Sequence, residues 1–161
     1  QLIEAVVKVN ESRKRAMGRK VIDALGGAKA ARGKRVALLG LTFKPNTDDM
    51  RDSPSLTIVP ALVGGGAKVR VVDPQGRREG EALLPGVNWF EDAYKATQNA
   101  DAVVILTEWN EFRALDLKRI VKRMATPVMA DLRNIYSQKD AKRAGFVAYT
   151  SVGREDYGID R

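Results

Sequence analysis

Apolar side chains recur at three- and four-residue steps through the first 25 residues, which is the spacing of one face of an α-helix. Gly26 and Gly27 follow directly, and glycine is the usual residue just beyond a helix end. The pattern predicts one long helix over residues 1–25, a length that suits a spacer or an oligomerisation helix. Its stripe consists of Leu2, Val6, Val9, Arg13, Met17 and Val21, widened by Ile3, Ile22 and Leu25.

Short apolar runs alternate with helical patterns over the rest of the chain. Strands are predicted at residues 35–41, 68–72, 102–106, 127–130 and 146–148. Helices are predicted at residues 54–63, 91–98, 110–124 and 137–144. Strands separated by helices form parallel sheets that are covered on both sides. The predicted fold class is therefore α/β: a Rossmann-like, mainly parallel sheet with helices on both faces, preceded by the long N-terminal helix.

The helix after the first strand has recognisable ends. Ser53 is expected as its N-cap and Pro54 as its first helical residue, both common choices at these positions. Three glycines, residues 64–66, are expected to end the helix. Because they follow a helix, we interpret them as a C-cap and not as a phosphate-binding loop.

Composition limits the chemistry that this chain can perform. Its 161 residues, 44% hydrophobic and 30% charged, suit one globular domain. Cysteine and histidine are absent, which excludes disulfides, thiolate nucleophiles, the usual zinc sites and imidazole acid–base catalysis. The net charge of +8 indicates an anionic partner: a phosphorylated metabolite, a nucleic acid or the acidic face of another domain.

The sequence carries no targeting signal that we recognise. No run of about 18 apolar residues is present, so no membrane span is predicted. The first residues lack the basic and apolar stretches of a signal peptide. Because the chain begins without Met and inside a helical pattern, we expect it to be cut from a longer protein.

Three polar clusters follow predicted strands, at residues 42–51, 107–109 and 131–134. Ligands of open parallel sheets bind beyond the carboxyl ends of the strands, so these clusters are expected to share one edge. Lys44, Arg51 and Arg133 could converge on a phosphate there, although each alone could be a solvated surface charge. Phe43 or Trp109 could cover a flat base or sugar. The helix opening at residue 54 would add its positive end.

Other polar residues favour structural roles. Gly40 stands alone after the first strand, so the glycine fingerprint of a dinucleotide site is missing. Asp73 ends the second strand, where a ribose-binding acid could lie, but a turn is favoured. Glu108 could make a polar contact in the site. The cluster of acids at Asp48, Asp49 and Asp52 matches no calcium loop and is expected to pair with Lys44 and Arg51, so no metal site is predicted.

Several blocks of the sequence then identify a family. Residues 40–56 read GLTFKPNTDDMRDSPSL, and this run is highly specific. Further blocks are GAKVRVVDP at 66–74, TEWNEF at 107–112, DLRNIY at 131–136 and SVGR at 151–154. Together they resemble the C-terminal UDP-sugar-binding domain of the UDP-glucose/GDP-mannose dehydrogenase family, most closely its bacterial UDP-glucose 6-dehydrogenases. The resemblance covers nearly the whole chain.

The resemblance implies a division of the chain and roles for four residues. Residues 1–27 would be the end of the family's central dimerisation helix, and residues 28–161 the UDP-sugar-binding domain. Phe43, Lys44 and Arg133 would bind the UDP-sugar, with Lys44 near the phosphates. Arg51 would reach the NAD that an N-terminal domain holds. The parent would be a homodimer through the central helix.

The resemblance also implies a reaction that this chain cannot complete alone. The family oxidises UDP-glucose twice with two NAD, giving UDP-glucuronate, and an upstream cysteine forms a thioester intermediate. No catalytic residue is expected in this chain, because it has no cysteine and no NAD glycine motif. The nucleotide-sugar supply of the cytoplasm suggests a cytoplasmic location.

Three alternatives stay open. A GDP-mannose or UDP-N-acetylhexosamine dehydrogenase would share most of these motifs. A stand-alone nucleotide-binding module could use the same fold. A nucleic-acid-binding protein would fit the charge, but the aromatic content is only 6% and no nucleic-acid-reading motif is recognised, so no nucleic-acid partner is predicted.

Overall fold

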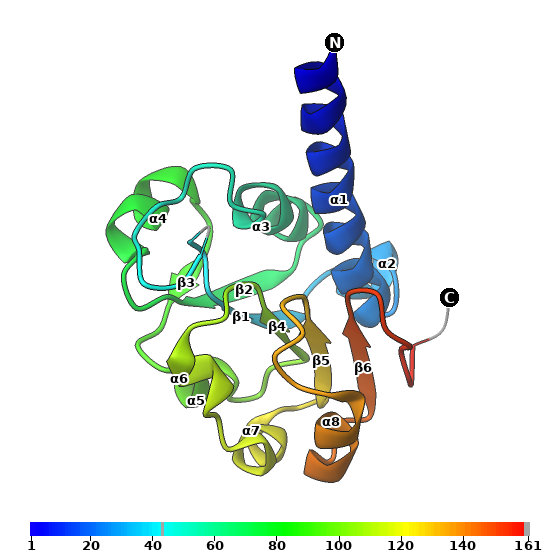
Figure 1. Cartoon of the computed structure of the whole chain (residues 1–161). Coiled ribbons are helices and arrows are strands. Elements are labelled where there is room, and N and C mark those ends of the chain that lie inside the picture. Colours follow the sequence, from blue (N-terminus) through cyan, green and yellow to red (C-terminus); the bar gives the residue numbers. More distant parts are fainter. Residues whose placement is uncertain (43, 160–161) are drawn as a thin grey trace.

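The computed structural model describes residues 1–42 and 44–159. Its centre is a six-stranded sheet in the order β3-β2-β1-β4-β5-β6, and every neighbouring pair of strands is parallel (Figure 1). The chain therefore adopts the predicted Rossmann-like α/β fold. The strands are β1 (Arg35–Leu39), β2 (Lys68–Val72), β3 (Asn88–Trp89), β4 (Ala102–Ile105), β5 (Val128–Asp131) and β6 (Ala148–Ser151).

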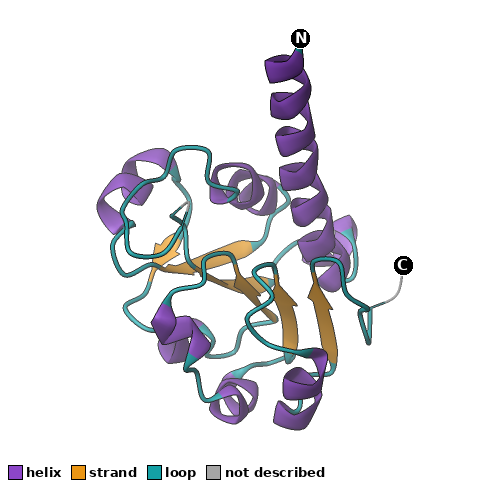
Figure 2. Ribbon diagram, in the orientation of Figure 1, coloured by secondary structure: helices purple, strands orange, loops and turns teal. Residues whose placement is uncertain are grey.

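Helices cover both faces of this sheet, as predicted (Figure 2). Side chains of a strand alternate between the faces, so Val36 and Leu38 of β1 join one hydrophobic cluster while Ala37 and Leu39 join the other. The helices are α1 (Leu2–Ala24), α2 (Ala28–Ala31), α3 (Ser55–Gly64), α4 (Arg77–Leu83), α5 (Ala93–Ala96), α6 (Asn110–Arg113), α7 (Leu117–Arg123) and α8 (Gln138–Ala144).

The long first helix is confirmed, and it has two different halves. Near its C-terminal end, Val21 is fully buried and Met17 packs against the core below it. The N-terminal half projects beyond the sheet and its helices (Figure 1), leaving Leu2 and Ile3 about four-fifths exposed. The glycines after the helix both have positive φ, which ends it. Helix α1 is therefore packed on the core along its C-terminal half and exposed along its N-terminal half.

The predicted helix over 110–124 is wrong as one element: the structure breaks it into α6 and α7. Asp116 starts a new helix there, because its carboxylate accepts a hydrogen bond from the Arg119 backbone N–H. The Leu115 N–H donates to the Tyr136 hydroxyl, which holds the break in place. The last strand begins at Ala148, two residues later than predicted, and the predicted helix over 91–98 is shortened to α5.

The start of α3 is tied to the end of β1. The Ser53 and Ser55 hydroxyls both donate to the Leu41 carbonyl, at 2.5 and 2.7 Å, and both residues are buried. Pro54 takes the cap position, so the helix begins at Ser55, one residue later than predicted. These bonds fix where the loop between β1 and α3 returns to the sheet, and this loop is the first wall of the site.

Candidate functional site

Three loops meet at the carboxyl ends of β1, β4 and β5, as the sequence predicts. The Thr107 hydroxyl, after β4, donates to the Thr42 carbonyl, after β1, at 2.9 Å. Gly40 allows this approach: a Cβ there would lie 2.5 Å from the Thr107 side chain, and its φ is 95°. Gly40 therefore serves close loop packing.

Asp73 at the end of β2 holds the first of these loops. One carboxylate oxygen accepts hydrogen bonds from the backbone N–H groups of Leu41 and Thr42, at 2.6 and 3.2 Å. The other accepts from those of Gln75 and Gly76, at 2.9 and 2.6 Å. Both oxygens are therefore engaged in structure, and the turn role favoured for Asp73 is confirmed.

The loop after β5 presents Arg133. Asp131 is fully buried, and its carboxylate accepts from the backbone N–H groups of Arg133 and Tyr136, at 3.2 and 2.7 Å. Burial raises the pKa of Asp131. The Arg133 Nε donates to the Glu108 carboxylate, and both side chains are largely covered, with 31% and 21% exposed. Glu108 thus has the polar contact considered for it: it orients Arg133.

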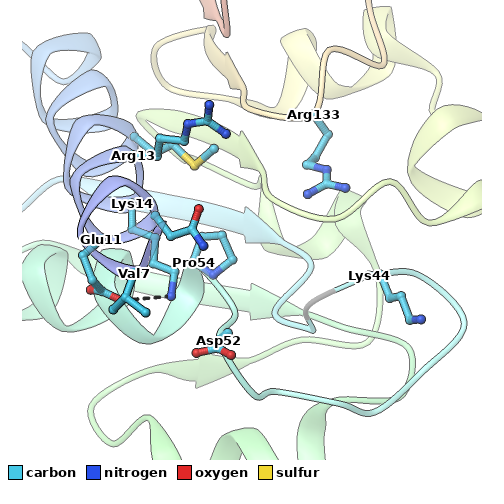
Figure 3. Close-up of a pocket in the computed structure, with 10 residues that line it drawn as sticks. Val7, Glu11, Arg13, Lys14, Lys44, Asp52, Pro54 and Arg133 are labelled. Atoms are coloured by element: carbon cyan, nitrogen blue, oxygen red, sulfur yellow. Dashed lines mark hydrogen bonds and ion pairs between the residues drawn. The ribbon is translucent and has the colours of Figure 1, made fainter. Parts of the chain in front are cut away.

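A cavity of about 460 Å³ lies between α1 and these strand ends (Figure 3). Lys44 and Arg133 both line it, so two of the three predicted cations share one space. The opposite wall is α1, which the sequence did not place in the site. The remaining lining residues are Val7, Asn10, Glu11, Arg13, Lys14, Met17, Asp52 and Pro54.

The other predicted site residues lie elsewhere. Arg51 does not line the cavity; its side chain is 89% exposed and binds Asp49 through two bonds, at 3.0 and 3.1 Å. This pair, which the sequence predicted, lowers the pKa of Asp49 to about 2. The prediction that Trp109 could cover a base or sugar is wrong: its side chain is only 5% exposed and belongs to a core cluster. Phe43 lies outside the described residues.

Neither a metal cluster nor a full dinucleotide site is found in residues 1–42 and 44–159. No group of three or more acidic, histidine or cysteine side chains is arranged to hold a metal there. The turn after β1 lacks a glycine-rich phosphate loop, and Asp73, at the ribose position, is already bonded to backbone. The described residues therefore do not fit a complete NAD site.

No helix in the described part of the chain is both long and apolar enough to cross a membrane.

The chain matches one family by sequence. The sequence model described as "UDP-glucose/GDP-mannose dehydrogenase family, UDP binding domain" matches residues 37–138. A UDP-glucose 6-dehydrogenase of Rhizobium meliloti (strain 1021) is 53% identical over 97% of this chain and 35% of that protein. The enzyme TuaD of Bacillus subtilis (strain 168) is 37% identical over 96% of this chain and 33% of its own. The chain thus spans about a third of the length of these relatives.

Solved structures of dehydrogenases of nucleotide sugars also resemble this chain. A UDP-glucose dehydrogenase from the archaeon Pyrobaculum islandicum aligns over 94% of this chain and 32% of its own, with a TM-score of 0.74 and 32% identity. A UDP-D-ManNAc dehydrogenase from Pyrococcus horikoshii aligns over 91% of this chain and 32% of its own, with a TM-score of 0.72 and 30% identity. The described fold therefore corresponds to about one third of the length of each of these two solved chains.

Proposed function

Because the chain belongs to the UDP-glucose/GDP-mannose dehydrogenase family, we propose that it is the substrate-binding part of a UDP-glucose 6-dehydrogenase. Residues 28–161 form the UDP-sugar-binding domain, and residues 1–27 are the end of the central dimerisation helix. The relatives in Rhizobium meliloti and Bacillus subtilis both carry this enzyme name, which supports UDP-glucose as the substrate.

One observation carries the proposal: Lys44 and Arg133 line the same cavity at the carboxyl ends of the strands. Its volume of about 460 Å³ is within the range of small-molecule sites, about 300–1,000 Å³. Lysine supplies a compact charge and arginine a planar fork, and both suit phosphate oxygens. We assign Lys44 to the diphosphate, and Phe43 and Arg133 to further contacts with the UDP-sugar.

The parent enzyme would convert UDP-glucose, two NAD and water into UDP-glucuronate and two NADH. This chain has no cysteine for covalent catalysis, so it is expected to bind substrate and to have no activity alone. Arg51 faces outward, which suits a contact to NAD bound mainly by an N-terminal domain. We place the parent in the cytoplasm as a homodimer formed through the central helix, with no nucleic-acid or membrane partner.

Calorimetric titration of the chain with UDP-glucose tests this function. Lys44→Ala and Arg133→Ala should each weaken binding about tenfold or more, because each removes a charge-assisted contact to phosphate or sugar. Lys68→Ala is the matched control, since Lys68 is exposed at the amino end of β2, away from the cavity. GDP-mannose should compete poorly.

Each other result has a clear meaning. Tighter binding of GDP-mannose would assign the parent to the GDP-mannose enzymes, and tighter binding of a UDP-N-acetylhexosamine to enzymes like the one from Pyrococcus horikoshii. UDP-glucose binding that neither substitution weakens would show that the site lies elsewhere. No heat with any nucleotide sugar would contradict a self-contained substrate site in this chain.

A further inference from the structure

Arg13 interrupts the apolar stripe of α1. The residues one turn before and after it in this stripe are Val9 and Met17, and Met17 packs against the core. In this register Val21 is fully buried two turns later, whereas Val9, one turn before Arg13, is about half exposed. At the height of Arg13 the helix has passed the hydrophobic core and borders the cavity instead. Arg13 is therefore an exposed cation at the point where the stripe passes from its packed part to its projecting part, beside the cavity.

The direction of the side chain agrees with this placement. Figure 3 shows the Arg13 guanidinium directed away from α1, into the space that Arg133 also faces. Lys44 lies on the loop across this space from the helix. By contrast, Arg15 of the same helix does not line the cavity. Cations from two walls thus border one volume large enough for a nucleotide sugar.

The ion pairs around the cavity leave Arg13 without a partner. Lys14 binds Glu11 at 3.3 Å, and Arg133 binds Glu108. Within the described part of the chain, no carboxylate lies within ion-pair distance of Arg13, and none of its hydrogen-bond donors is used. An arginine offers a planar fork that can bind two phosphate oxygens at once. Arg13 is therefore free to accept an anion entering the cavity.

We propose that Arg13 is a diphosphate-binding residue of this site, supplied by α1 and acting together with Lys44 on the opposite wall. This inference rests on the proposed function, because it assigns a further residue to the same nucleotide-sugar site. It also means that the end of the central helix has two uses: it joins the parts of the parent and it forms one wall of the substrate site. Removing the helix should then weaken binding even where the sheet stays folded.

The test compares Arg13→Gln with Arg15→Gln, which removes the same charge from another side of the same helix. The probes are UDP and inorganic pyrophosphate, titrated calorimetrically into the whole chain. Arg13→Gln should weaken both about tenfold or more, and Arg15→Gln less than about twofold. Arg13→Lys should fall between, because it keeps the charge and loses the fork. Thermal unfolding should not change, since Arg13 makes no bond within the described chain.

The outcomes separate this inference from the function on which it rests. UDP binding that needs Lys44 but is unchanged in Arg13→Gln would overturn the role of Arg13 and leave the function intact. Pyrophosphate binding that needs Arg13, without any binding of UDP, would support the anion site and contradict the nucleotide-sugar function. No binding of either probe by the unsubstituted chain would overturn both.

Discussion

Replacing Asp73 by asparagine should destabilise the chain, because Asp73 fixes the loop after β1, although its own side chain does not line the cavity. Its carboxylate accepts four backbone N–H groups, two on each oxygen, and so joins the turn after β2 to the loop after β1. Asparagine keeps one acceptor oxygen and turns an amide donor toward the other two N–H groups. One pair of hydrogen bonds is therefore lost at this half-buried position.

The expected loss follows from those two bonds. A hydrogen bond to a charged group contributes about 1.5 kcal/mol at the low end of its range, so Asp73→Asn should lower the unfolding free energy by about 3 kcal/mol. For a chain of this size each kcal/mol shifts the midpoint temperature by about 2–4 °C, which gives about 6–12 °C. Thermal unfolding followed by circular dichroism measures this shift directly.

A matched control is available at Asp92, which caps α5 by accepting the Lys95 backbone N–H at 2.8 Å. Asparagine caps a helix about as well as aspartate, so Asp92→Asn should leave the midpoint nearly unchanged. An Asp73→Asn midpoint within about 2 °C of that of the unsubstituted chain would contradict the stabilising role of these hydrogen bonds. Lost UDP affinity in that stable variant would return Asp73 to the ribose-binding role.

Two further substitutions test the packing of the loops and the cap of the last helix. Gly40→Ala should cost about 2–5 kcal/mol by urea unfolding, because the added Cβ meets Thr107 at 2.5 Å and the φ of 95° disfavours it; an unchanged midpoint would refute the close contact. Ser137→Ala should cost about 1 kcal/mol at neutral pH, because it removes the capping box with Asp140. The hydrogen bond from the Ser137 backbone N–H lowers the pKa of Asp140, so this stabilisation is complete above the unfolded value of 3.8 and is lost as the pH falls through the folded one. Alanine keeps this backbone N–H, so Asp140→Ala is the variant that tests the acid-sensitive part: its penalty should shrink in acid, and a penalty that grows there would contradict the assignment.

The strands could be predicted because each central one is a continuous apolar run between polar loops, as in Ala102–Ile105. The sequence did not predict the elements that lack a regular spacing of apolar residues. Helix α4, Arg77–Leu83, has the sequence RREGEAL, in which four of the seven residues are charged, and it buries only Gly80. Strand β3 has two residues, too few to show an alternation. The break before Asp116 depends on the Tyr136 hydroxyl, which accepts a hydrogen bond from the Leu115 N–H across 21 residues of the chain.

The sequence predicted where the site lies better than it predicted which side chains point into it. Parallel topology brings the strand ends together, so Lys44 and Arg133 were expected near each other, and they line one cavity. The topology did not predict the direction of each side chain: Trp109 points into the core, and Arg51 points outward and binds Asp49. The one signal for the α1 wall was a cation, Arg13, inside an apolar stripe.

The most direct test of nucleotide-sugar binding at this site is a nitrogen-15 NMR titration of the chain with UDP-glucose, which shows residue by residue where the ligand binds. We predict that backbone amide shifts concentrate in three loops, residues 42–54, 107–109 and 131–134, and in residues 10–14 of α1. Shifts confined to another surface, such as the hollow between α7 and α8, would contradict the site. An unchanged spectrum at saturating ligand would contradict nucleotide-sugar binding by this chain.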